Sequence, residues 1–296
     1  MLNSTAATRR QGSGPVPERF IRQPGAPGPR RIAAVAAVAI PIEAELPAGG
    51  LLLDTLAQLI ARHGGESACL TLAGGGFGPF GYVIPALSPD TSHAAFYSAP
   101  RRPPGITRLD IAAITVGWRD GRPFFHCHAL WTEADGTLGC GHVLPEETVV
   151  AAPIRATGAA LVGARFEATQ DEETGFKLFS PVATGTALPA RAIPGVALRL
   201  APNQDLVETL QRAAMEARLG RAAVRGGVAS TIGARFADAK PIEGFATELL
   251  VTRGVLGDTS ALDIAIVDLD GTIGQGRVLA GDNPVLMTFE GFLEAV

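Results

Sequence analysis

Three of the five histidines in this 296-residue chain lie in one short stretch, Phe125–Leu144, together with two of the three cysteines. The stretch has the pattern of a β-hairpin, because two apolar runs flank the turn-forming pair Asp135-Gly136. The histidines are His126, His128 and His142. Imidazole nitrogen is a common protein ligand of Zn²⁺ and other divalent metals, so the chemistry that these residues favour is metal binding.

The register of this hairpin decides whether the three imidazoles can meet. A two-residue loop would put His142 on the face away from His128. A three-residue loop, Ala134–Gly136 with Gly136 in the left-handed conformation, places His128 directly opposite His142 instead. His126 then shares that face, because side chains along a strand repeat every two residues. Opposed Cβ atoms lie roughly 5 Å apart, so we predict the three-residue loop and a metal site on these histidines, with Zn²⁺ as the metal that suits them best.

Two further groups are candidates near this site. Cys140 lies on the same face of the strand and is either a fourth ligand or a small buried apolar residue. A long loop, residues 82–107, is predicted to fold over the site and to bind a small, anionic ligand through His93, Tyr97, Arg101 and Arg102. No general base stands beside the histidines in the sequence, which leaves open whether the protein catalyses a reaction.

Apolar spacing indicates a helix over residues 51–63 that ends at Gly64-Gly65. Strands are predicted at 68–73 and 111–118, with further extended chain at 149–166. Residues 1–31 are rich in Pro, Gly, Ser and Arg and have no apolar period, so we expect a disordered tail there. Residues 167–194 are the best candidate for a linker between domains.

The second half of the chain repeats the first. Leu46–Leu56 matches Leu200–Leu210 at an offset of 154, and Asp135–Leu144 matches Asp270–Leu279 at an offset of 135. The second copy therefore lacks 19 residues between its helix and its hairpin. Internal duplication at these offsets predicts two similar domains.

The repeat replaces all three histidines. In the second copy the matching residues are Ala261, Asp263 and Arg277. With the same hairpin register, Asp263 lies opposite Arg277, so a cross-strand ion pair stands where the opposed histidines were. We therefore expect the second copy to be a structural or regulatory partner without a comparable site.

These residues resemble the plants-and-prokaryotes conserved (PPC) domain, which also occurs in plant AT-hook proteins. The resemblance rests on Leu51–Ile60, Cys69–Gly81, Leu109–Gly117 and the histidines at 126 and 128 with Gly141-His142-Val143-Leu144. It covers residues 40–165 and, more weakly, 195–296.

The resemblance implies an α/β (α+β) protein with two tandem PPC-like domains, each an antiparallel-rich mixed sheet with packed helices. We assign residues 1–31 to the tail, 32–166 to the first domain, 167–194 to the linker and 195–296 to a degenerate second domain. Prokaryotic PPC proteins imply a homo-oligomer, a trimer, with the histidine triplet as a metal-binding cluster.

Composition limits the partners. No apolar run is long enough to span a membrane, and three cysteines without C-x-x-C spacing fit a reducing cytoplasm. Residues 1–31 carry a net charge of +5 and the remainder −9, which is a poor footprint for binding nucleic acid. Gly121-Arg122-Pro123 resembles an AT-hook core but lies between two apolar runs and predicts a hairpin turn. A metal and a small molecule are thus the expected partners. The alternatives are DNA binding through the arginine-rich tail and an oligomeric scaffold without a ligand.

Overall fold

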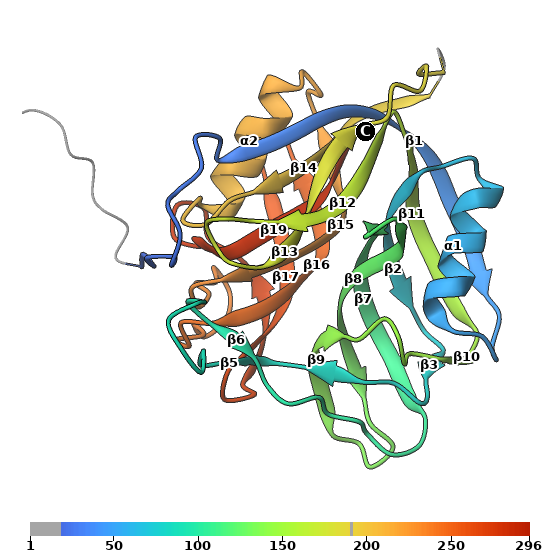
Figure 1. The fold of residues 1–296 in the computed structure, drawn as a ribbon, viewed down its shortest axis with the longest axis vertical. Coiled ribbons are helices and arrows are strands. Elements are labelled where there is room, and N and C mark those ends of the chain that lie inside the picture. Colours follow the sequence, from blue (N-terminus) through green and yellow to red (C-terminus); the bar gives the residue numbers. More distant parts are fainter. Residues whose placement is uncertain (1–18, 190–191) are drawn as a thin grey trace, which may run out of the picture.

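The computed structural model describes residues 19–189 and 192–296, which form β-strands and two α-helices (Figure 1). The first half contains β1 (Ile32–Leu46), α1 (Leu52–Arg62), β2 (Ser67–Ala73), β3 (Gly76–Phe77), β4 (Tyr82–Val83), β5 (Pro85–Ala86), β6 (Phe96–Tyr97), β7 (Thr107–Arg119), β8 (Arg122–Thr132), β9 (Leu138–Val143), β10 (Val150–Ala152) and β11 (Ile154–Val162). The hairpin β12 (Ala164–Gln170) and β13 (Lys177–Ala183) follows. The second half contains β14 (Ile193–Leu200), α2 (Leu206–Glu216), β15 (Ala222–Thr231), β16 (Thr247–Leu256), β17 (Ala261–Asp268), β18 (Ile273–Arg277) and β19 (Val285–Ala295).

The two halves have the same strand order. In the first half the neighbours run β1-β11-β2-β7-β8-β9. In the second they run β14-β19-β15-β16-β17-β18. Each half carries one helix between its first two strands in the chain, as the repeat in the sequence requires. The arrangement is consistent with two tandem domains.

The predicted fold class holds in its coarser form. The sheets are antiparallel-rich as expected, and β12 with β7 is the one parallel pair within the described strands. Helices contribute little, since the helices described are 11 residues each. The chain is therefore more strongly β than the expected mixed sheets with packed helices.

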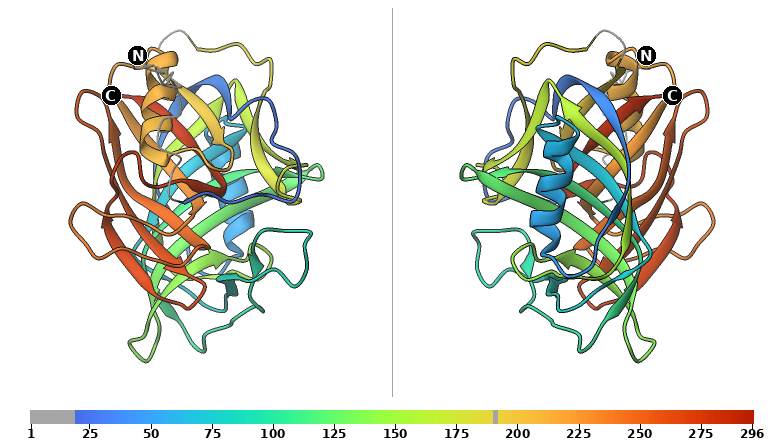
Figure 2. Two further views of the ribbon diagram at one scale, coloured as in Figure 1. Left: turned by 90° about the vertical axis from the view of Figure 1, so that its left-hand side faces the viewer. Right: turned by 90° about the vertical axis from the view of Figure 1, so that its right-hand side faces the viewer.

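One strand joins the two halves. The first part of β1 pairs with β14, and its second part pairs with β11, so the main sheet runs on from one half into the other. The two halves also face each other, with α1 on the side away from the second half (Figures 1 and 2). Val228, Leu250 and Val267 of the second half belong to the same buried apolar cluster as the first-half core. The junction between the halves is thus a continuous core.

The segment expected to be a linker is folded. Residues 167–194 include most of the β12–β13 hairpin, whose strands pair from Ala164 with Ala183 to Gln170 with Lys177. Apolar residues in this segment, among them Phe179, pack into a buried cluster. The Pro and Ala content that suggested a linker therefore did not exclude a strand.

The predicted tail is ordered over its second part. Ile21 N–H donates to Asn203 Oδ1 at 3.0 Å, and Gln23 Nε2 donates to Leu286 O at 2.6 Å. Arg31 forms an ion pair with Glu173 at 2.6 Å. Residues 19–31 therefore dock on the second half and on the β12–β13 hairpin rather than being disordered, and residues 1–18 lie outside the described residues.

The hairpin register agrees with the prediction. His128 pairs with His142, and Asp263 pairs with Arg277 in the second copy, where an Nε–Oδ1 distance of 2.9 Å marks the expected ion pair. Glu133 N–H donates to Thr137 O at 2.8 Å, which closes the three-residue loop. Gly136 has φ +89°, the left-handed conformation that this loop requires.

Replacing Gly136 by alanine tests this turn. No atom lies within 4 Å of a Cβ added there, so the cost comes only from the left-handed backbone, about 1 kcal/mol of the free energy of unfolding. Gly28→Ala is the matched control, because Gly28 has similar space and no left-handed φ. Urea unfolding of both variants measures the difference, and equal stabilities would contradict the assigned turn.

Candidate metal centre

The three histidines converge on one point. His126 and His128 project from β8, and His142 projects from β9. His126 Nε2 lies 3.0 Å from His128 Nε2, which lies 3.3 Å from His142 Nδ1. The face shared by these side chains is therefore the one that the register predicted.

A fourth potential ligand comes from the second half. Glu248 on β16 places Oε2 2.8 Å from His128 Nε2. The four potential ligand atoms, one from each residue, all lie within 4.8 Å of one another. Glu248 was not predicted from the sequence, because the second copy lacks the histidines and was expected to carry no comparable site. The available signal was a carboxylate between apolar residues in a strand, which is rarely left unpaired when buried.

The outer nitrogens of two histidines are held by hydrogen bonds. His128 Nδ1 donates to the carbonyl oxygen of Leu249 at 2.7 Å, so Nε2 is the ring nitrogen that faces the centre. His126 Nδ1 lies 2.5 Å from Oε1 of Glu290 on β19. Such carboxylate and carbonyl partners commonly orient histidines that ligate metals. Both partners again come from the second half.

These residues fit a divalent metal. Ligands placed 2.0–2.1 Å from a tetrahedral Zn²⁺ lie roughly 3.3 Å from one another, close to the separations of 2.8, 3.0 and 3.3 Å around His128 Nε2. The other carboxylate oxygen of Glu290 is buried and has no hydrogen-bond partner in the part of the chain described. Three imidazoles with carboxylates nearby therefore form a donor set of the right chemistry and spacing.

Burial and charge shift two of the histidines in opposite directions. Burial lowers the pKa of His126, but the charge and hydrogen bond of Glu290, with the charge of Glu248, outweigh burial and raise it overall. Burial, followed by the charges of His126 and His128, lowers the pKa of His142 well below its usual value. His142 is therefore neutral, as a metal ligand must be.

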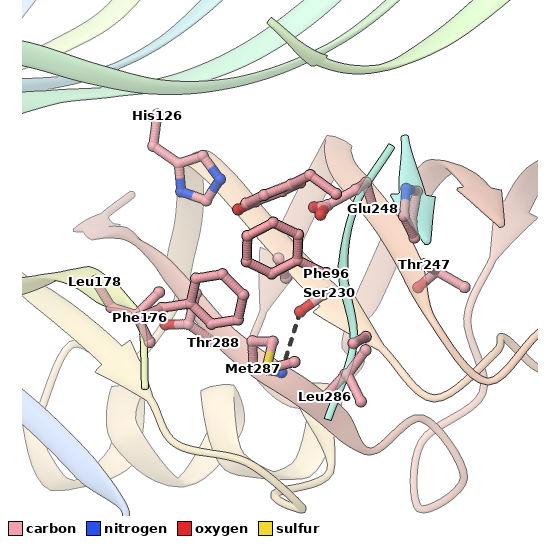
Figure 3. A pocket seen from close by; sticks show the side chains of 14 residues that line it. Phe96, His126, Phe176, Leu178, Ser230, Thr247, Glu248, Leu286, Met287 and Thr288 are labelled. Carbon is pink, nitrogen blue, oxygen red and sulfur yellow. Dashed lines mark hydrogen bonds between the residues drawn. The ribbon is translucent and has the colours of Figure 1, made fainter. Parts of the chain in front are cut away.

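A cavity of about 30 Å³ lies beside the centre (Figure 3). His126 points toward it from β8, and Ser230, Met287 and Thr288 lie on its opposite side. Its other walls come from strands of the second half, from the loop between β4 and β7 and from the β12–β13 hairpin. The lining residues used below are Phe96, Tyr97, Phe176, Leu178, Glu248 and Leu286.

The predicted ligand-binding loop is only partly at this cavity. Tyr97 lines it, and its ring centroid lies 5.2 Å from that of His142. Burial, with the charges of Glu248 and Glu290, raises the pKa of Tyr97, so the phenol stays protonated. His93 does not line the cavity; its ring packs against Phe176 at 4.3 Å behind the wall.

The two predicted arginines lie elsewhere. Arg101 pairs through its backbone with Tyr82, and Arg102 forms an ion pair with Glu147 at 2.5 Å. Neither lines the cavity. The structure therefore does not bring the two arginines to the cavity wall, and the side chain of Arg102 is paired with Glu147 instead.

Cys140 belongs to the apolar core rather than to the converging ligand atoms. Burial, and to a smaller extent the charge of Glu248, raises the pKa of its thiol. Among the described residues, Glu248 and not Cys140 joins the three histidines as a potential ligand. Cys140 is instead a small buried residue of the apolar core.

Comparison with known proteins gave structural similarity only. No family model matches the chain, and no curated protein matches it. A metal-containing protein of Archaeoglobus fulgidus is 22% identical, with a TM-score of 0.38, over 48% of this chain and 94% of its own. A plant- and prokaryote-conserved (PPC) protein of Pyrococcus horikoshii is 20% identical, with a TM-score of 0.39, over 50% of this chain and 95% of its own. The solved structures similar to this chain thus include a PPC protein, as the sequence resemblance implied.

Neither helix in the described part of the chain has the length and apolar character needed to cross a membrane.

The opposite pKa shifts predict opposite titrations in the metal-free protein. His126, whose pKa is raised above the usual 6.5, stabilises the fold when protonated, and that stability is lost as pH rises through its folded-state pKa. His142, whose pKa is lowered, is protonated more readily in the unfolded chain, so its effect is to reduce stability as pH falls below 6.5. Imidazole ¹⁵N chemical shifts measured against pH check both directions.

Two variants serve this titration. Glu290→Gln removes the carboxylate charge that raises the pKa of His126, so we expect the pKa of His126 to fall. Glu147→Gln is the control, because it removes a carboxylate from the exposed pair with Arg102 and should leave the pKa of His126 unchanged. A wild-type His126 that titrates below 6.5 would show that burial outweighs Glu290.

Proposed function

We propose that this protein binds one divalent metal ion through His126, His128, His142 and Glu248. The observation that carries the proposal is the convergence of four ligand atoms within 4.8 Å of one another, two of the imidazoles being oriented by hydrogen bonds from their outer nitrogens. Three imidazoles and one carboxylate suit Zn²⁺ best, and Ni²⁺, Cu²⁺ and Fe²⁺ are alternatives with the same ligand preference.

The metal would lie between the two halves of one chain. β8 and β9 supply the histidines, whereas β16 supplies Glu248 and β19 supplies Glu290. The centre therefore needs no residue from a second subunit. The homotrimer and the cytoplasmic location stay predictions from the sequence.

We also propose that a small molecule binds in the adjoining cavity. A bound divalent ion supplies Lewis acidity toward an oxygen atom of such a molecule. The walls would bind the molecule and exclude water, because Phe176, Leu178 and Leu286 offer apolar contacts. Tyr97 keeps its phenol proton and can donate a hydrogen bond. Binding, rather than any particular reaction, is the function that these residues support.

Removing ligands should abolish or weaken metal uptake. The double variant His128→Ala with His142→Ala leaves two of the four ligands, so we expect no stoichiometric Zn²⁺ after dialysis. Glu248→Gln keeps the shape but removes the charge, and we expect the affinity to fall by at least the roughly 10–100-fold that outer partners of metal ligands typically contribute. Elemental analysis and competition with a chromogenic chelator measure both effects.

Glu45→Gln is the control, because Glu45 is an exposed carboxylate on β1. At a Zn²⁺ concentration a hundredfold above its Kd, the free energy of unfolding of the wild type should rise by about 2.7 kcal/mol. The same Zn²⁺ concentration should not change the stability of the double variant. Equal metal content in all four proteins would refute the proposed centre.

A further inference from the structure

On the side of the cavity opposite His126, two hydroxyl groups have uncommitted hydrogens. Ser230 Oγ accepts a hydrogen bond from Met287 N–H at 3.0 Å (Figure 3), and Thr288 Oγ1 accepts one from Arg199 Nε at 3.2 Å. Neither hydroxyl donates to an acceptor among the described residues. Both side chains are buried, with relative exposures of 5% and 3%. Since buried donors are nearly always paired, these hydroxyls indicate an oxygen or nitrogen acceptor in the cavity.

The third hydroxyl in this wall behaves differently. Thr247 Oγ1 donates to Thr231 O at 2.9 Å and accepts from Thr231 N–H at 3.0 Å. Its hydrogen is therefore committed within the protein. On the side of the cavity opposite His126, the uncommitted donors are thus Ser230 on β15 and Thr288 on β19.

The charges around the cavity argue against an anion. The carboxylates facing the centre are Glu248 and Glu290, and together they balance a divalent metal ion. Arg199, which contacts Thr288, is paired with Asp171 at 2.7 Å. No arginine or lysine lines the cavity. An anionic ligand would therefore enter a site without net positive charge.

Size and wall chemistry limit the ligand further. A volume of about 30 Å³ accommodates roughly two or three water-sized groups, since each needs ~10–15 Å³ by this measure. Phe176, Leu178 and Leu286 offer apolar contacts for the remainder of the molecule, and Phe96 at the rim is 38% exposed. The ligand is thus short, with one polar end and a small apolar end.

We infer that the cavity binds a small uncharged carbonyl compound, such as a short amide, ketone or aldehyde, whose oxygen accepts hydrogen bonds from Ser230 and Thr288. This inference rests on the proposed metal centre, which forms the other wall of the cavity. It replaces the anionic ligand expected from Arg101 and Arg102 with a neutral one, and it assigns recognition to the second half of the chain.

Acetamide is a suitable probe, with acetate as an anion of the same shape. The full-length protein is loaded with Co²⁺, and the paramagnetic relaxation of the probe's methyl protons is measured against a Zn²⁺-loaded blank. We expect saturable relaxation by acetamide with a Kd of about 1 mM, as suits a ligand of so few atoms, and weaker binding of acetate. The Co²⁺ content is measured separately.

Variants locate the binding site. Ser230→Ala and Thr288→Val each remove one donor, so we expect each to weaken acetamide binding about threefold to tenfold while Co²⁺ content stays at the wild-type level. Thr288→Ser keeps the hydroxyl and should retain binding. Thr169→Val, at an exposed position on β12, is the matched control.

The outcomes separate the two proposals. Absence of Co²⁺ from the wild-type protein contradicts the metal centre itself. Bound Co²⁺ without relaxation of acetamide, tighter binding of acetate than of acetamide, or unchanged binding in both hydroxyl-deleted variants overturns the inferred ligand class and leaves the metal centre standing.

Discussion

The contact between His126 and Glu290 is the constraint on which the site depends. Glu290 is fully buried in a central stretch of β19, where an unpaired carboxylate would be costly to desolvate. Its one hydrogen-bond partner within the described residues is His126, on a strand from the other half. Each half therefore contains a polar group that only the other half can satisfy. The apolar core around His126 and Glu290 sets the distance between the two halves. The pairing of the imidazole with the carboxylate determines which faces of the two sheets lie against each other.

The two halves contribute differently to this arrangement. The first half carries the three imidazoles on one hairpin face, whereas the equivalent face of the second half carries the exposed pair of Asp263 and Arg277. The second half supplies carboxylates and hydroxyls from other strands instead, β15, β16 and β19. Two similar sheets that face each other need not carry equivalent sites, because one composite site at their junction uses a different part of each.

The sequence predicts the hairpin well because its constraints are local. The turn at Gly136 and the two-residue repeat of strands together determine that His128 faces His142. The repeat offsets likewise place α1 and α2 and show that the second copy is shorter between its helix and its hairpin. Residues 74–106 separate β2 from β7, whereas residues 232–246 separate β15 from β16. The turn, the strand alternation and the repeat offsets are all patterns along the chain, so they can be recognised in a single sequence.

Glu248 and Glu290 could not be placed from the sequence in the same way. They lie more than a hundred residues from the histidines, and their role follows only from how the two sheets pack. Phe176 and Leu178 were hidden for the same reason, since a Pro- and Ala-rich segment gave no sign that its hairpin would reach the cavity.

The arginines of the long loop suggested an anion site by their charge, but neither of them lines the cavity. Arg101 is tied to Tyr82 by its backbone, and Arg102 is tied to Glu147 by its side chain. In the proposed centre, the two carboxylates of the second half would balance the charge of a divalent ion and leave no net charge with which to select an anion. Selectivity would then depend on hydrogen-bond donors and on the shape of the apolar wall.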